Sequence, residues 1–241
     1  MVKFSIITVC FNSEKTIERT IKSVLDQTLD AYEYIIIDGK SSDGTLDIIR
    51  SYEARFNGRL KWVSEEDEGI YDAMNKGIQI ATGDIIGIVN SDDYYEIDAL
   101  EKVAEAYKGH KYCIIYGLLR KVYLGEEVAV YMNSHKFIEK NMITHPTCFI
   151  SRYIYDKYGL YDNTYKYSAD YEFFLRIRNS QEITYTPIYS ILSNFTIDGA
   201  SASAKGYRDT LKLKHKYGLL NGYRYWIPLL KSKISIILGR S

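Results

Sequence analysis

Short apolar runs alternate with helix-like stretches through the first half of the chain. The runs are bounded by turn residues and rich in Ile and Val, a pattern typical of strands buried on both faces, and they cover residues 4–9, 34–37, 60–63 and 85–89. Between them, apolar residues recur at helical spacing around residues 17–25, 46–49 and 70–81, and Ser13 is the expected N-cap of the first helix. This βαβαβαβ order predicts a mostly parallel sheet with helices on both faces.

The second half of the chain is less regular. We expect longer strands with an antiparallel excursion in residues 112–130, a strand in 145–150, a helix in 171–178 and one or two strands in 183–194. A Gly/Ala/Ser-rich stretch then leads to a helical tail. The predicted fold class is therefore α/β, with one domain over residues 1–204 and a basic amphipathic helical tail over residues 205–241.

The cysteines and the start of the chain favour a cytoplasmic protein. Cys10, Cys113 and Cys148 are scattered through apolar runs, and no Cys-x-x-Cys pair is present, so the sequence supports neither a zinc site nor a disulfide framework. We expect buried thiols in a reducing compartment. Because the chain begins directly with a strand pattern, we expect no secretion signal.

Charge is segregated along the chain although the formal net charge is zero. Residues 205–241 hold nine Lys/Arg and one acidic residue, Asp209, which gives +8, and the remaining residues carry −8. The tail also contains the aromatic and aliphatic run 223–230, and this mixture is typical of a helix lying on an anionic membrane surface. The alternative is a C-terminal helix that packs its apolar face on the main domain.

The sequence Asn90-Ser91-Asp92-Asp93 directly follows the apolar run 85–89. In an open parallel sheet, ligands bind outside the carboxyl ends of the strands. Two adjacent carboxylates repel each other unless a cation or hydrogen-bond donors compensate them, and their hard oxygens suit Mn²⁺ or Mg²⁺. The cluster is therefore a candidate metal site, and the alternative is an acidic turn that caps the next helix.

Four segments, in this order and spacing, resemble the family 2 glycosyltransferases, which have the GT-A fold. They are Ser5–Asn12, Ile37–Thr45, Glu68–Asp84 with its Gly69-Ile70-Tyr71-Asp72-Ala73-Met74-Asn75-Lys76-Gly77 core, and Asn90–Asp93. Each motif is weak alone, but the ordered set is specific. The resemblance implies an inverting, metal-dependent enzyme that moves a sugar from a nucleotide diphosphate, here a UDP-sugar, to an acceptor hydroxyl.

The resemblance also implies roles for individual residues. Asp38 would hydrogen-bond the nucleotide base, and Asp92 would hold the metal with Asp93 as a second ligand or neighbour. Asn90 stands where the family's Asp-x-Asp motif has its first Asp. The predicted donor site comprises Thr8, Asn12, Asp38, Asp72, Asn75, Asn90, Ser91 and Asp92.

Asp170 is the candidate catalytic base. The run from Ala169 to Arg176 resembles the family's Glu-Asp motif followed by a helix, with Ala169 in place of the usual Glu. Inversion by a single displacement needs one carboxylate opposite the leaving group, and the alternative role for Asp170 is a helix N-cap. On the acceptor side or in a lid we place His145, Arg176, Gly199 and Ser201, with a structural role as the alternative for the first two.

The basic, aromatic tail also leads to predictions about the acceptor and about the location of the enzyme. We expect a lipid-linked saccharide as acceptor, in the assembly of cell-surface polysaccharide, at the inner face of the cell membrane. Two other functions compete: a nucleotidyltransferase, which should carry a Gly-rich basic signature where this chain has Cys10–Ser13, and a nucleotide-sugar-binding protein without catalysis, which needs no Asp170. A nucleic-acid partner is not expected, because the basic residues are confined to one end.

Overall fold

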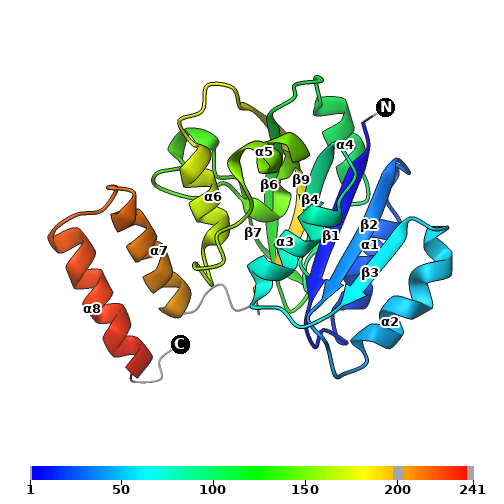
Figure 1. Cartoon of the computed structure of the whole chain (residues 1–241), viewed down its shortest axis with the longest axis horizontal. Helices are drawn as coiled ribbons and strands as arrows, with labels where there is room; N and C mark the ends of the chain where they lie inside the picture. Colours follow the sequence, from blue (N-terminus) through cyan, green and yellow to red (C-terminus); the bar gives the residue numbers. More distant parts are fainter. Residues whose placement is uncertain (1, 198–203, 238–241) are drawn as a thin grey trace.

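A nine-stranded sheet with helices on both faces forms the body of the protein in this computed structural model, which describes residues 2–197 and 204–237 (Figure 1). The strands are β1 Phe4–Cys10, β2 Tyr32–Asp38, β3 Leu60–Ser64, β4 Ile85–Ile88, β5 Tyr94–Tyr95, β6 Cys113–Tyr123, β7 Glu126–Tyr131, β8 Phe149–Ser151 and β9 Thr184–Thr196. The helices are α1 Ile17–Leu25, α2 Thr45–Tyr52, α3 Ile70–Ile80, α4 Ala99–Ala106, α5 Arg152–Tyr158, α6 Ala169–Ile177, α7 Ala204–Lys216 and α8 Tyr223–Ile237. Short 3₁₀ turns lie at Glu53–Phe56, His135–Phe137 and His145–Thr147.

The first half of the sheet is parallel, as the apolar runs predicted. Strands β3, β2, β1 and β4 are neighbours in that order, and Phe4 of β1 aligns with Tyr32 on one side and Ile85 on the other. Because these strands run the same way, the loops that follow them all emerge at one edge of the sheet. That edge carries the candidate site.

The second half contains the predicted antiparallel excursion. Strand β8 pairs antiparallel with both β4 and β6, and β6 and β7 form a hairpin. Strand β9 runs parallel to β6 and pairs antiparallel with the short β5, which follows the Asn90–Asp93 cluster. The C-terminal part of β9 is thereby brought beside this cluster.

Two local predictions were wrong. Helix α1 begins at Ile17 rather than after Ser13, because residues 14–16 form a turn in which the Ser13 carbonyl accepts hydrogen bonds from the N–H groups of Thr16 and Ile17. Residues 145–147 form a 3₁₀ turn instead of the start of a strand, with Pro146 in its first turn, and the strand begins only at Phe149. Proline fixes its own backbone angle and lacks an N–H group, which favours such a turn.

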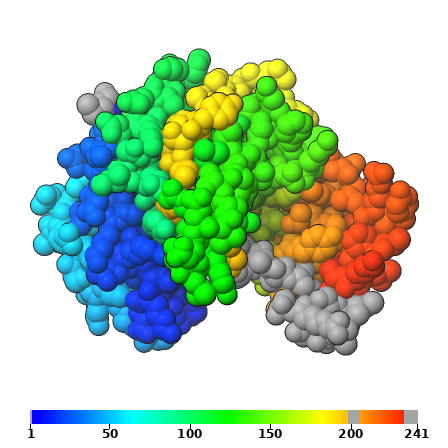
Figure 2. All heavy atoms as spheres, turned by 180° about the vertical axis from the view of Figure 1, so that it is seen from behind, coloured from blue at the N-terminus to red at the C-terminus, as the bar shows by residue number. Residues whose placement is uncertain are grey.

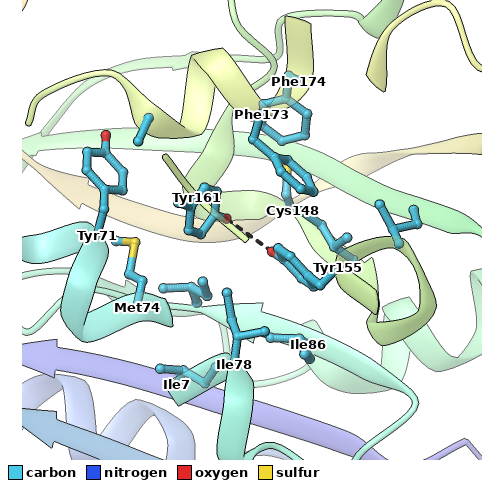
Figure 3. Packing of buried hydrophobic residues seen from close by; sticks show 14 of the residues in the cluster. Ile7, Tyr71, Met74, Ile78, Ile86, Cys148, Tyr155, Tyr161, Phe173 and Phe174 are labelled. Atoms are coloured by element: carbon cyan, nitrogen blue, oxygen red, sulfur yellow. Dashed lines mark hydrogen bonds between the residues drawn. The ribbon is translucent and has the colours of Figure 1, made fainter. Parts of the chain in front are cut away.

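The hydrophobic core lies on both faces of the parallel strands. In β1, Ile7 and Val9 face the layer of α3 and α6, whereas Phe4, Ile6 and Cys10 face the layer of α1, α2 and α4. Figure 3 shows the first layer, where Ile7 and Ile86 from the sheet pack under Ile78 and Met74 of α3, next to an aromatic cluster from α5 and α6. This alternation is the period of two that a pleated strand imposes.

The tail forms two helices, of which α7 packs on the body. Leu213 of α7 is buried against Tyr171 and Leu175 of α6, and the Tyr217 hydroxyl donates to Glu172 Oε1 at 2.6 Å. Helix α8 lies against α7, and the Tyr225 ring stacks on His215 with 4.0 Å between ring centroids. Figure 2 shows both helices, orange and red, at one side of the body, away from the blue N-terminal half. Helix α7 therefore packs its apolar face on the main domain, which was the alternative to membrane contact for the tail.

Candidate active site

Three loops at the carboxyl edge of the parallel sheet are joined by hydrogen bonds. Ser13, after β1, contacts Ser91, after β4, with 2.9 Å between the hydroxyl oxygens. Asn12 donates its backbone N–H to Ser41 Oγ at 2.8 Å, and its side-chain oxygen accepts from the N–H of Ser42 at 2.9 Å, both in the loop after β2. The structure thus brings together the predicted donor residues of these loops.

Asp38 is fully buried at the end of β2 and organises the loop that follows it. Its carboxylate accepts hydrogen bonds from the N–H and hydroxyl of Ser41 at 3.0 and 2.5 Å, and from Ser64 Oγ at 2.6 Å. Cys10 Sγ is a fourth donor, at 3.5 Å. A carboxylate with these partners holds its loop in one conformation.

Thr8 lies inside the protein and not at the site. Its side chain is fully buried on the α1 and α2 side of β1, where Thr8 Oγ1 accepts a hydrogen bond from the Tyr34 hydroxyl at 2.9 Å. Thr8 also lies within β1, before the loop that follows the strand, and its hydroxyl already has a partner. We therefore withdraw Thr8 from the donor site and regard it as a core residue.

The Asn90–Asp93 cluster is held from three directions. Asp93 is fully buried and accepts the N–H of Thr196, at the end of β9, at 3.0 Å. Its backbone carbonyl accepts from Thr20 of α1 at 2.6 Å, and the Asp92 carbonyl accepts from Arg19 at 2.6 Å. Because α1 and β9 both bind this turn after β4, the fold places the Asp93 carboxylate and the backbone of both residues.

Two groups of this cluster carry oxygen atoms that a cation could use. Burial and the neighbouring Asp92 carboxylate raise the pKa of Asp93 well above its usual value. The Nδ2 of Asn90 is 3.5 Å from Asp93 Oδ2, and the buried Oδ1 of Asn90 has no hydrogen-bond partner among the described residues. The Asp93 carboxylate and the Asn90 amide oxygen thus supply hard oxygen atoms of the kind that Mg²⁺ and Mn²⁺ prefer.

Asp72, in the first turn of α3, and Asn75, in the middle of the helix, have different partners. Burial would raise the pKa of Asp72, but hydrogen bonds from the Glu68 N–H and from Lys76 outweigh it and lower that pKa. Asn75 is buried, and it donates to the Tyr161 carbonyl at 2.9 Å while accepting the Tyr161 N–H at 3.0 Å. Asn75 therefore clamps the loop before α6 onto α3, and we withdraw it from the donor site.

Asp170 occupies the second position of α6 and is partly exposed. The N-cap position belongs to Ser168, so the alternative of an Asp170 N-cap is wrong. Asp170 Oδ1 accepts hydrogen bonds from the Tyr71 hydroxyl and from the Tyr171 N–H, each at 2.8 Å. The carboxylate is thereby fixed beside the start of α3, at the same edge of the sheet as the loops described above.

The predicted acceptor-side residues have structural partners. His145 is buried and its Nε2 lies 3.0 Å from the Tyr161 hydroxyl, and burial lowers its pKa, an effect that the charge of Asp170 opposes. Arg176 binds the carbonyls of Tyr158 and Leu160 and pairs with Glu172 at 3.1 Å. We therefore adopt the structural alternative for both residues. Gly199 and Ser201 lie outside the described residues.

Two side chains near these loops were not among the predicted site residues. Phe11, directly after β1, has a 63 % exposed side chain. Tyr71 lines a small pocket at the start of α3 together with Glu68, Asp72, Asn163 and Lys166. An exposed aromatic residue directly after a buried strand was the available signal for Phe11, whereas the partner of Tyr71 is 99 residues away in sequence.

Comparison with known sequences identifies the family. A sequence model described as glycosyl transferase family 2 matches residues 5–209. The chain belongs to this family. A PGL/p-HBAD biosynthesis glycosyltransferase of Mycobacterium bovis is 27% identical over 213 residues, which cover 87% of this chain and 82% of the relative. An uncharacterized glycosyltransferase of Mycobacterium tuberculosis is 34% identical over 179 residues, 71% and 67% of the two chains.

Solved structures show that this family 2 glycosyltransferase has the GT-A fold, as the resemblance implied. The S. aureus protein TarS in complex with UDP superposes with a TM-score of 0.71 at 19% identity, over 98% of this chain and 72% of TarS. A mannosyltransferase of Pyrobaculum calidifontis, in complex with GDP-Man and Mn²⁺, gives a TM-score of 0.68 at 16% identity, over 99% and 71% of the two chains. The family membership excludes the nucleotidyltransferase alternative.

Proposed function

We propose that the protein transfers a sugar from a UDP-sugar to an acceptor hydroxyl with inversion at the anomeric carbon. The observation that carries the proposal is the hydrogen bond from Tyr71 to Asp170. Helix α3 starts at the carboxyl edge of the sheet, so this bond brings Asp170 to the edge where Asp92 and Asp93 lie. A base and a candidate metal site on one edge are what a single displacement requires.

The donor's nucleoside would bind across the loops after β1 and β2. The exposed Phe11 ring offers a face on which a base can stack, and the loop that Asp38 holds together forms the adjacent wall. Asn12 is joined to this wall through its bond to Ser41, and Ser91 is joined to the loop after β1 through its bond to Ser13. TarS, a structural neighbour, binds UDP and UDP-GlcNAc in its crystal structures, which supports uridine as the base.

Asp92 would be the first metal ligand, and Asp93 its neighbour or second ligand. Among the described residues, no group of three or more His, Cys, Asp or Glu side chains could hold a metal ion by itself. A cation here would therefore complete its shell with diphosphate oxygens and water, as Mg²⁺ commonly does. When bound, Mn²⁺ or Mg²⁺ neutralises the charge that develops on the leaving diphosphate.

Asp170 would accept the proton of the acceptor hydroxyl as its oxygen attacks the anomeric carbon. The carboxylate is partly exposed and its orientation is fixed by two hydrogen bonds, so it can meet an incoming hydroxyl. A fixed base of this kind contributes about 10²–10⁴-fold to rate.

The acceptor would be a lipid-linked saccharide at the inner face of the cell membrane. Helix α8 exposes Tyr223, Trp226, Ile227 and Leu230, spaced as one stripe of a helix, with exposed fractions of 69, 57, 51 and 58 %. The basic residues Arg224 and Lys231 are exposed beside this stripe, as in helices that lie on anionic bilayers.

Two further observations bear on the membrane and on the pathway of the acceptor. The described helices include none that is both long and apolar enough to span a bilayer. Bacillus subtilis TuaG, whose name assigns it provisionally to teichuronic acid biosynthesis, is 41% identical over 102 residues, 42% of this chain and 40% of TuaG. That relative supports a place in surface polysaccharide assembly.

A thermal-shift panel of UDP-, GDP- and TDP-sugars with and without Mn²⁺ tests the donor assignment. A ligand at 100 times its Kd stabilises by about 2.7 kcal/mol, which raises Tm by about 5–10 °C for a chain of this size. We expect this rise with UDP-sugars and Mn²⁺ together, and its loss in Asp92→Ala but not in the control Asp156→Ala, an exposed acid on α5. A rise that needs no metal, or that survives in Asp92→Ala, contradicts the metal assignment.

A further inference from the structure

The two oxygens of the Asp170 carboxylate have different surroundings. Oδ1 accepts two hydrogen bonds, from the Tyr71 hydroxyl and from the Tyr171 N–H. Among the described residues, Oδ2 receives no hydrogen bond. One oxygen of the carboxylate is therefore held by the protein, and the other remains available to a substrate.

Tyr71 is rigidly placed for this contact. Its side chain is 8 % exposed, and its ring packs 5.7 Å from the Tyr161 ring in the aromatic cluster (Figure 3). Figure 3 shows the ring standing on α3 with its hydroxyl directed away from the helix. Burial, and then the charge of Asp170, raise the pKa of Tyr71 well above its usual value, so the hydroxyl keeps its proton and donates it at neutral pH.

We propose that Tyr71 is a positioning residue for the catalytic base, because its hydroxyl fixes Asp170 Oδ1 and leaves Oδ2 to face the acceptor hydroxyl. This inference rests on the proposed role of Asp170. In the displacement, the acceptor oxygen forms a bond to the anomeric carbon and its proton moves to Oδ2. The bond from that carbon to the diphosphate oxygen breaks, and its electron pair leaves with UDP.

The other titratable groups around Asp170 are neutral near pH 7, which leaves the Tyr71 hydroxyl as an important partner of its carboxylate. The Asp170 charge also acts on His145, Cys148 and Tyr161, which come from two other segments of the chain, residues 145–148 and the loop between α5 and α6. Burial lowers the pKa of His145 and raises the pKa of Cys148 and Tyr161, so all three are neutral near pH 7. Two donors therefore hold the Asp170 carboxylate, and of these the Tyr71 hydroxyl is the one that mutation can remove.

The test is the pH profile of Tyr71→Phe with a UDP-sugar donor that binds the wild type. Loss of a donor to a carboxylate disfavours its charged form, so the acid limb of kcat should move to higher pH by about one unit. We also expect about a tenfold lower kcat on the plateau, because a base that is less well oriented reacts more slowly. The KM for the donor should stay within about twofold of wild type.

Tyr155→Phe is the matched control. It removes a hydroxyl from the same aromatic cluster, where Tyr155 contacts the Tyr161 hydroxyl at 3.1 Å and not Asp170. Its acid limb should coincide with that of wild type. If Tyr71→Phe does not fold, 3-fluorotyrosine at position 71 keeps the shape and makes the hydroxyl a stronger donor, so the acid limb should move to lower pH.

The outcomes separate this inference from the proposed function. An inactive Asp170→Asn together with a Tyr71→Phe profile identical to wild type overturns the role of Tyr71 and leaves the base in place. A shift of equal size in Tyr155→Phe also overturns it, because the effect would then be general to the cluster. Full activity in Asp170→Asn contradicts the proposed function itself.

Discussion

The Asn75→Ala variant tests directly whether the side-chain amide of Asn75 binds the nucleotide-sugar donor or supports the fold. The Asn75→Ala variant leaves the Tyr161 N–H and carbonyl without partners, and both groups are buried. Each buried polar group that loses its partner costs about 1–3 kcal/mol, so the variant should lose about 2–5 kcal/mol of unfolding free energy. A chain of this size loses about 2–4 °C of Tm per kcal/mol, which predicts a Tm lower by about 10 °C.

Urea unfolding followed by circular dichroism measures this loss, and calorimetric titration with UDP and Mn²⁺ at low temperature measures donor binding by the folded variant. We expect the Kd for UDP to stay within about twofold of wild type, because Asn75 faces the Tyr161 backbone. Gln79→Ala, at an exposed position of the same helix, is the control and should be close to wild type in both assays. Wild-type stability combined with much weaker UDP binding would refute the clamp and restore Asn75 to the donor site.

Two further predictions concern charge and the tail. Burial alone would raise the pKa of the 5 % exposed Glu33, but hydrogen bonds from Ser5, Lys61 and Thr82 lower that pKa to about 2 from 4.5. The resulting stabilisation, up to about 3 kcal/mol, is present above pH 4.5 and is lost as the pH falls toward 2. The free energy of unfolding, measured with urea, should therefore vary less with pH between 3 and 6 in Glu33→Gln than in wild type. The same slope of free energy against pH in both proteins would contradict this. For the tail, Trp226→Ser combined with Leu230→Ser should abolish flotation with vesicles that contain anionic lipid, whereas Tyr189→Ser, at an 80 % exposed residue of the body, should not. Persistent flotation of the double variant would reject α8 as the membrane contact.

The order of strands and helices was readable because burial on both faces leaves long apolar runs in a parallel sheet. The runs that became β1, β2, β3 and β4 were each placed within two residues of their ends. The turn at residues 14–16 and the 3₁₀ turn at 145–147 were missed, since each is closed by hydrogen bonds over three or four residues and is too short to leave a periodic apolar pattern.

Individual roles in the site were harder to predict than the motifs. Asp72 and Asn75 share one face of α3 by their spacing, but the sequence does not show that Asn75 meets the Tyr161 backbone, 86 residues away. His145 and Arg176 likewise bind partners that only the folded chain brings near, such as Tyr161 and the carbonyl of Leu160. Long-range contacts thus decide whether a polar residue in a motif faces the ligand or supports the scaffold.

The stereochemistry of donor hydrolysis tests the central claim most directly. Water can replace the acceptor, so one-dimensional proton NMR of a UDP-α-sugar incubated with enzyme and Mn²⁺ reports the first-formed anomer without knowledge of the natural acceptor. The account predicts that the β-sugar appears first with wild type, and that Asp170→Asn binds UDP normally but releases no sugar. An α-sugar formed first, or wild-type turnover by Asp170→Asn, would contradict it.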